Sequence, residues 1–109
     1  MAGAIKSIAS RTLPREYRNI DTATARVILF EGGPRVLAGF PEQLSIRAQD
    51  DLKRLGVEVE MNCRVTNVDS SGVTLGERIV PAGNVFWAAG VKATPLTRTI
   101  GCDIDRAGR

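Results

Sequence analysis

Apolar residues recur at two spacings along the chain, and each spacing predicts a type of element. Between Ala2 and about Leu13 they follow the spacing of an amphipathic helix. A polar connection, residues 14–25, leads to four consecutive apolar residues, Val27–Phe30, two of them β-branched. This run predicts a strand that is buried on both faces.

A second helix is predicted to begin at Pro41 and Glu42, because proline and an acidic residue both favour the first turn of a helix. Gly56 is placed as the residue that ends it. The alternation of apolar and acidic residues in Val57–Met61 then predicts a strand with one solvent-exposed face, at or near a sheet edge. The buried face of the helix is expected to consist of Leu44, Ala48, Leu52 and Leu55.

Short alternating strands with polar turns follow, and they predict an antiparallel meander over residues 64–80. Its strands are expected at 64–68, 73–75 and 78–80. The apolar segment Asn84–Gly90 predicts a further buried strand that ends in small residues, with Trp87 in the core.

Composition and charge exclude several classes of function. The chain has 109 residues and a net charge of +3 from scattered charges, which gives no basic patch for nucleic acid. No apolar run is long enough to span a bilayer. With no histidine and two isolated cysteines, Cys63 and Cys102, the sequence predicts no metal site and no cysteine–histidine nucleophile. We expect reduced thiols and a cytoplasmic protein.

The predicted order of helices and strands is that of a nucleotide-binding α/β domain with an antiparallel excursion. Such a domain normally opens with a strand and a glycine-rich turn, whereas this sequence opens with a helix. The expected fold is therefore an incomplete Rossmann-like domain. It combines parallel strands with a β-meander and lacks the first strand and the glycine-rich turn.

Four segments in order carry a resemblance to a known family. They are Met1–Ile5, Ala25–Leu37, Leu55–Val59 and Trp87–Val91. Together they resemble the NADH-binding domain of type II NADH dehydrogenases, flavoproteins of the pyridine nucleotide-disulfide oxidoreductase superfamily. The resemblance implies transfer of hydride from NADH to FAD and then of electrons to a membrane quinone.

In that family the segment similar to Met1–Gly3 directly follows the GxGxxG turn. The resemblance therefore implies that residues 1–91 are a truncated NADH-binding domain and that residues 92–109 begin the connection back to a FAD domain. No complete FAD site is expected within the chain, so the isolated chain should lack NADH oxidase activity. Contact with membrane and quinone would occur only through other parts of a parent enzyme, on the cytoplasmic face of the inner membrane.

Glu31 follows a predicted buried strand, where a carboxylate can accept hydrogen bonds from the ribose hydroxyls of NADH and repel the 2′-phosphate of NADPH. The alternative is a solvated acid in a turn. Arg35 could instead favour a phosphate, but a surface charge is the simpler interpretation. The acidic pairs Asp50–Asp51 and Glu58 with Glu60 are expected to lie on solvated faces.

The remaining candidates for cofactor contact are small or apolar. Gly32 and Gly33 would let the backbone approach the adenosine, although glycines after a strand often serve only a turn. The resemblance places the Val65 backbone near the adenine. It places Ala88, Ala89 and Gly90 near the nicotinamide, while tight helix packing explains these small residues equally well. No residue is assigned a catalytic role.

Two other functions remain open at this stage. In the first, the chain is a non-catalytic binding or assembly module. Loss of the first strand would expose apolar edges beside Val27–Phe30 and Val85–Ala89, which predicts a homodimer or a domain-swapped assembly. In the second, the chain belongs to an NADPH-dependent flavoprotein reductase, which Glu31 disfavours.

Overall fold

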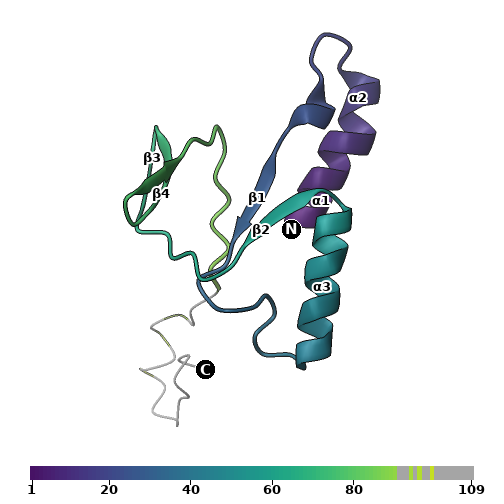
Figure 1. The fold of residues 1–109 in the computed structure, drawn as a ribbon. Coiled ribbons are helices and arrows are strands. Elements are labelled where there is room, and N and C mark those ends of the chain that lie inside the picture. The colour runs from purple at the N-terminus through teal and green to yellow at the C-terminus, as the bar shows by residue number, and fades with distance from the viewer. Residues whose placement is uncertain (91–93, 95, 97–98, 100–109) are drawn as a thin grey trace.

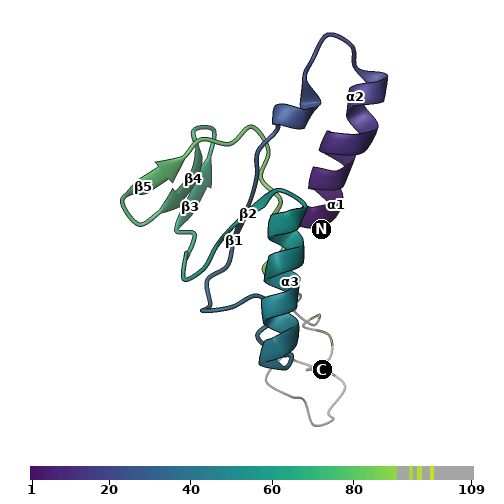
Figure 2. The same cartoon turned by 45° about the vertical axis from the view of Figure 1, so that its right-hand side comes forward.

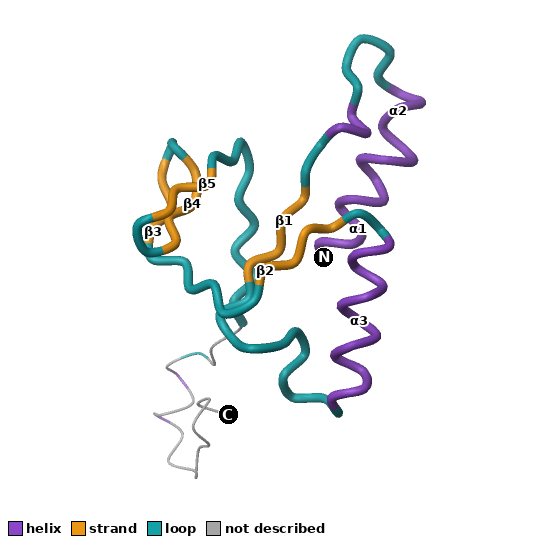
Figure 3. Tube along the Cα trace, viewed as in Figure 1, coloured by secondary structure: helices purple, strands orange, loops and turns teal. Residues whose placement is uncertain are grey.

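The structure, a computed structural model, describes residues 1–90, 94, 96 and 99. Figure 1 shows two parts: a parallel two-stranded sheet with helices on one side, and a small antiparallel sheet. Figure 2, a view turned by 45°, and the tube in Figure 3 show the same division. The mixed α/β architecture predicted from the sequence is confirmed. None of the helices in the described part is long and apolar enough to cross a membrane.

The first helix is longer than the sequence analysis predicted. It consists of α1 (Ala2–Ser7), a π-helical turn (Ile8–Thr12) and α2 (Leu13–Glu16). Pro14 does not end it, because this proline lies in the first turn of α2, where its missing N–H is tolerated. The N–H of Tyr17 donates to the Leu13 carbonyl over 2.9 Å and completes the last turn.

Strand β1 (Val27–Phe30) is parallel to β2 (Val57–Glu60), with Val27 opposite Val57 and Phe30 opposite Glu60. The strands are confirmed, but the prediction that β1 is buried on both faces is wrong. All four of its residues are only half-buried, because β2 is the one strand that pairs with β1 in the described part of the chain.

Helix α3 (Glu42–Arg54) connects β1 to β2 and completes a β-α-β unit. Gly56 follows it with a φ of +84°, so the predicted C-terminal glycine is confirmed. The predicted apolar face is only partly covered: Leu44 is 48% exposed and Leu55 is 38% exposed, whereas Ser45 is 3% exposed. Figure 1 shows that the first turns of α3 lie beyond the end of the parallel sheet.

The meander forms as predicted, with strands β3 (Asn67–Asp69), β4 (Gly72–Leu75) and β5 (Arg78–Val80) in antiparallel order. Its first strand starts three residues later than expected. The chain up to Cys63 is still paired with the residue after β1, because the N–H of Cys63 donates to the Glu31 carbonyl.

The segment 84–90 differs most from its prediction. It forms no strand and all its residues are exposed, with Phe86 at 64% and Trp87 at 69%, so Trp87 is not a core residue. A strand needs a partner to satisfy its backbone groups, and no described strand pairs with this segment. The buried apolar side chains of the described part are Ala9, Val36, Val57, Val73 and Val80.

Candidate functional site

Glu31 lies at the carboxyl end of β1, where the sequence analysis placed it. Its N–H donates to the Glu60 carbonyl and its own carbonyl accepts from the Cys63 N–H, each over 2.9 Å. These bonds extend the β1–β2 pairing past the last residues of both strands. Both backbone polar groups of Glu31 are therefore bonded to β2 and the loop that follows it.

The side chain of Glu31 is half-buried and turns toward its own loop. Its Oε1 atom accepts a hydrogen bond of 2.8 Å from the N–H of Gly33. This bond sets the orientation of the carboxylate and leaves lone pairs on both oxygens available to a ligand. A carboxylate oriented in this way at the end of a parallel strand can accept hydrogen bonds from two adjacent hydroxyl groups.

Gly32 and Gly33 differ in the space around them. A Cβ atom on Gly33 would lie 3.3 Å from Oε1 of Glu31, whereas a Cβ atom on Gly32 would meet nothing within 4 Å. Neither glycine has a positive φ. A side chain at position 33 would therefore press on the Glu31 carboxylate, whereas Gly32 leaves open space at the loop surface.

The loop after β2 completes the surroundings of Glu31. Asn62 has a φ of +54°, and its N–H donates to the Gly33 carbonyl over 2.9 Å. Residues of this loop and of the antiparallel sheet, among them Asn62, Arg64, Leu75 and Arg78, line a hollow of about 420 Å³. Glu31 is not one of its lining residues. Val65 is half-buried in the same loop, two residues beyond the Cys63 N–H that contacts Glu31.

The other predicted contact residues are not joined to this loop. Ala88, Ala89 and Gly90 are exposed, and Gly90 has a φ of +107°. No hydrogen bond among the described residues connects them to Glu31. Arg35, considered for a phosphate, donates to the Ala38 carbonyl over 2.9 Å and contacts Ser45. Its guanidinium therefore stabilises the loop before α3.

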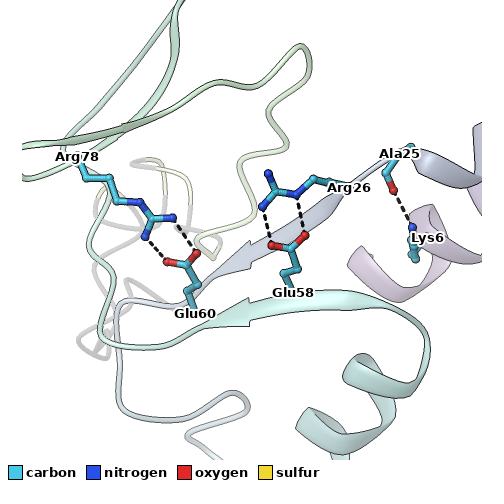
Figure 4. Close-up of polar contacts among 6 residues, drawn as sticks. All are labelled: Lys6, Ala25, Arg26, Glu58, Glu60 and Arg78. Carbon is cyan, nitrogen blue, oxygen red and sulfur yellow. Dashed lines mark hydrogen bonds and ion pairs between the residues drawn. The ribbon is translucent and has the colours of Figure 1, made fainter.

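The sequence analysis missed the ion pairs of β2, although Glu58 is exposed, as the predicted solvated face requires, and Glu60 is half-buried. Each carboxylate accepts two hydrogen bonds from an arginine, as Figure 4 shows. Glu58 accepts from Arg26, the residue before β1, over 2.8 and 2.7 Å. Glu60 accepts from Arg78 over 2.7 and 3.0 Å, which joins β2 to the antiparallel sheet.

Hydrogen bonding from the arginines is the main cause that lowers the pKa of both glutamates. Each partner arginine has its pKa raised by the same contact. The alternation of apolar and acidic residues along β2 predicted exposed acids, but arginine partners 32 and 18 residues away leave no local signal in the sequence.

The cysteines and the acidic residues offer no metal chemistry in the described part. Cys63 is a free thiol whose Sγ lies 3.7 Å from Oε2 of Glu60. Cys102 lies outside the described residues. Among the residues that the structure describes, no three histidine, cysteine, aspartate or glutamate side chains are grouped to hold a metal ion.

Comparison with known proteins identifies the family of the chain. Residues 2–109 match the pyridine nucleotide-disulphide oxidoreductase family. Over its whole length the chain is 41% identical to the type II NADH:quinone oxidoreductase NdhA and 38% identical to the type II NADH:quinone oxidoreductase Ndh, both of Mycobacterium tuberculosis. A type II NADH:quinone oxidoreductase of Haemophilus influenzae is 35% identical over 83% of the chain.

The chain spans 25%, 26% and 21% of these three relatives, or about a quarter of their length. The resemblance noted in the sequence is thus confirmed over the whole chain. The chain belongs to the pyridine nucleotide-disulphide oxidoreductase family.

Proposed function

We propose that this chain supplies the part of an NADH:quinone oxidoreductase that binds the adenosine ribose of NADH. One observation carries the proposal: the carboxylate of Glu31 is held at the end of a parallel strand by the N–H of Gly33, over 2.8 Å. Parallel strands of nucleotide-binding domains end in such an acid, which accepts hydrogen bonds from the ribose hydroxyls.

The same carboxylate would select NADH over NADPH. The 2′-phosphate of NADPH would bring a second negative charge next to Glu31, and like charges repel strongly where solvent is partly excluded. Arg35 would not offset this repulsion, because its guanidinium is committed to Ala38 and Ser45. An NADPH-dependent reductase is therefore the less favoured alternative.

The proposal also covers the nicotinamide of NADH and the flavin that accepts its hydride. Ala88, Ala89 and Gly90 have small side chains that would leave room for a nicotinamide ring. Hydride acceptance is the chemistry of FAD, which we expect other segments of such an enzyme to bind. The names of the relatives support the quinone step. The cytoplasmic face of the membrane follows only from the family resemblance seen in the sequence.

Titration of the chain with NADH and, separately, with NADPH tests the proposal, with the emission of the reduced nicotinamide as the signal. We expect saturable binding of NADH and weaker binding of NADPH. Glu31→Gln replaces hydrogen bonds to a charged acceptor with neutral ones, so it should weaken NADH binding about tenfold. Glu16→Gln, at an exposed position of α2, serves as the matched control.

Absence of NADH binding by the unaltered chain would overturn the proposal. Equal affinity of the unaltered chain and Glu31→Gln would remove Glu31 from the site. A preference for NADPH would instead support the NADPH-dependent alternative.

A second candidate function is assembly through the sheet. β1 pairs with β2 along one edge, and no described strand pairs with its other edge. An unpaired strand edge can recruit a strand from another chain, which favours a homodimer or a domain swap. Light scattering of the chain measures this directly. A dimer mass supports assembly, and a monomer mass contradicts it.

A further inference from the structure

Asn62 has a left-handed backbone conformation, which is unusual for a residue other than glycine. Its φ of +54° lies in the left-handed region, which asparagine tolerates better than most residues but which is costly for other side chains with a Cβ. The residue comes two positions after the end of β2 and has an exposed side chain. No hydrogen bond of that side chain is present among the described contacts, so its backbone is the part that acts on its neighbours.

The left-handed turn directs two successive N–H groups at the loop that follows β1. The N–H of Asn62 donates to the Gly33 carbonyl, and the N–H of Cys63 donates to the Glu31 carbonyl, each over 2.9 Å. Gly33 in turn donates its own N–H to Oε1 of Glu31 over 2.8 Å. The orientation of the Glu31 carboxylate therefore depends on Gly33, and Gly33 is fixed from the other side by Asn62.

Glu60, which precedes this turn, is held by hydrogen bonds as well. Glu60, two residues before Asn62, accepts the N–H of Glu31 at its carbonyl, and its side chain is bonded to Arg78 of the antiparallel sheet. Asn62 is thus free to change conformation only by releasing its hydrogen bond to Gly33. A residue that avoids the left-handed region would favour that release.

We propose that Asn62 is a positioning residue for the nucleotide: its left-handed backbone holds the Glu31–Gly33 loop in the conformation that binds the ribose. The inference rests on the proposed function and adds to it a residue that need not touch the ligand. When a binding-competent loop is populated only in part, the apparent affinity falls by that fraction.

The test compares Asn62→Ala with Asn62→Gly in the purified chain, with NADH as the probe. Glycine adopts the left-handed region at little cost, whereas alanine does not. NADH affinity is therefore expected to fall about five- to tenfold in Asn62→Ala and to stay within roughly threefold of the unaltered chain in Asn62→Gly. Asn19→Ala, at an exposed position between α2 and β1 with no positive φ, is the matched control.

Every titration is done well below the melting temperature of the variant concerned, so that a loss of folded protein does not count as a loss of affinity. If Asn62→Ala does not fold, Asn62→Ser makes the same comparison, because serine also disfavours the left-handed region. A general structural role would lower the melting temperature and leave the affinity of the folded protein unchanged.

Three results would overturn the inference. An alanine or serine variant with unaltered NADH affinity would show that the turn does not control the loop. A glycine variant as weak as the alanine variant would show that the side chain of Asn62, and not its backbone, matters. Failure of the unaltered chain to bind NADH would remove the proposed function itself, and with it the inference.

Discussion

Arg78 donates two hydrogen bonds to the carboxylate of Glu60, over 2.7 and 3.0 Å, and so connects the antiparallel sheet to the strand that ends beside Glu31. The backbone carbonyl of Glu60 accepts the N–H of Glu31. Glu60 therefore contacts both the meander, through its side chain, and the candidate nucleotide loop, through its backbone. The position of the loop relative to the meander depends on this contact.

The Glu60–Arg78 pair predicts a specific dependence of stability on pH. The pKa of Glu60 is lowered in the folded chain, mainly by hydrogen bonding from Arg78, so the pair adds stability above about pH 4.5, the ordinary value for glutamate. That stability is lost as the pH falls through the lowered pKa, because the carboxylate then takes up a proton. The effect should be small, since Arg78 is largely solvated.

Urea unfolding at pH 6.5 and at pH 3.5 measures this dependence. Glu60→Gln should lose less stability between the two pH values than the unaltered chain does. Glu77→Gln, next to Arg78 and exposed, should keep the pH dependence of the unaltered chain. The same pH dependence in Glu60→Gln and Glu77→Gln would show that the pair does not contribute.

A methyl group on Gly33 should disturb the carboxylate of Glu31. The added Cβ would lie 3.3 Å from Oε1, so the side chain must shift by a few tenths of an ångström. Gly33→Ala should weaken NADH binding about two- to tenfold, the net contribution of one hydrogen bond. Gly39→Ala is the control, since a Cβ at Gly39 meets nothing within 4 Å. Equal affinity in both variants would contradict the role of the Gly33 contact.

Gly72 should be the glycine on which the meander depends most. Its φ is +132°, and a Cβ there would lie 2.2 Å from the carbonyl oxygen of Val80 in the neighbouring strand. Gly72→Ala should lower the free energy of unfolding by roughly 3 kcal/mol or more, because strain and a backbone clash combine. Thermal or urea unfolding measures the loss.

Gly76→Ala provides the comparison within the same meander. Gly76 has a φ of +62°, but a Cβ there would meet nothing within 4 Å. Only the cost of the left-handed conformation applies, about 1 kcal/mol. A loss in Gly72→Ala no larger than that in Gly76→Ala would contradict the packing around β4 and β5.

Local signals in the sequence were sufficient for several elements. Helix α3 has proline and glutamate at its start and glycine after its end. The apolar run Val27–Phe30 is too short for a helix and therefore predicts a strand. The turns of the meander have glycine at positions 72 and 76, both with positive φ. These residues act on their immediate neighbours, so their effect can be read from the sequence alone.

Features that depend on distant residues could not be predicted in the same way. Burial of β1 and the pairing of segment 84–90 both require a neighbouring strand, which no local pattern supplies. The partners of Glu58 and Glu60 lie 32 and 18 residues away. The position of Glu31 was predictable from the end of its strand, whereas the left-handed turn at Asn62 that contacts its loop had no signal beyond the tolerance of asparagine.

We propose that NADH binds at the end of β1, against the loop of Glu31 and Gly33. The most direct measurement is the change in backbone amide chemical shifts of the ¹⁵N-labelled chain on addition of NADH. We predict saturable shifts of the amides of Glu31, Gly33, Asn62 and Cys63, with little change in the β4–β5 turn. An unchanged spectrum at saturating NADH, or changes confined to the meander, would contradict the account.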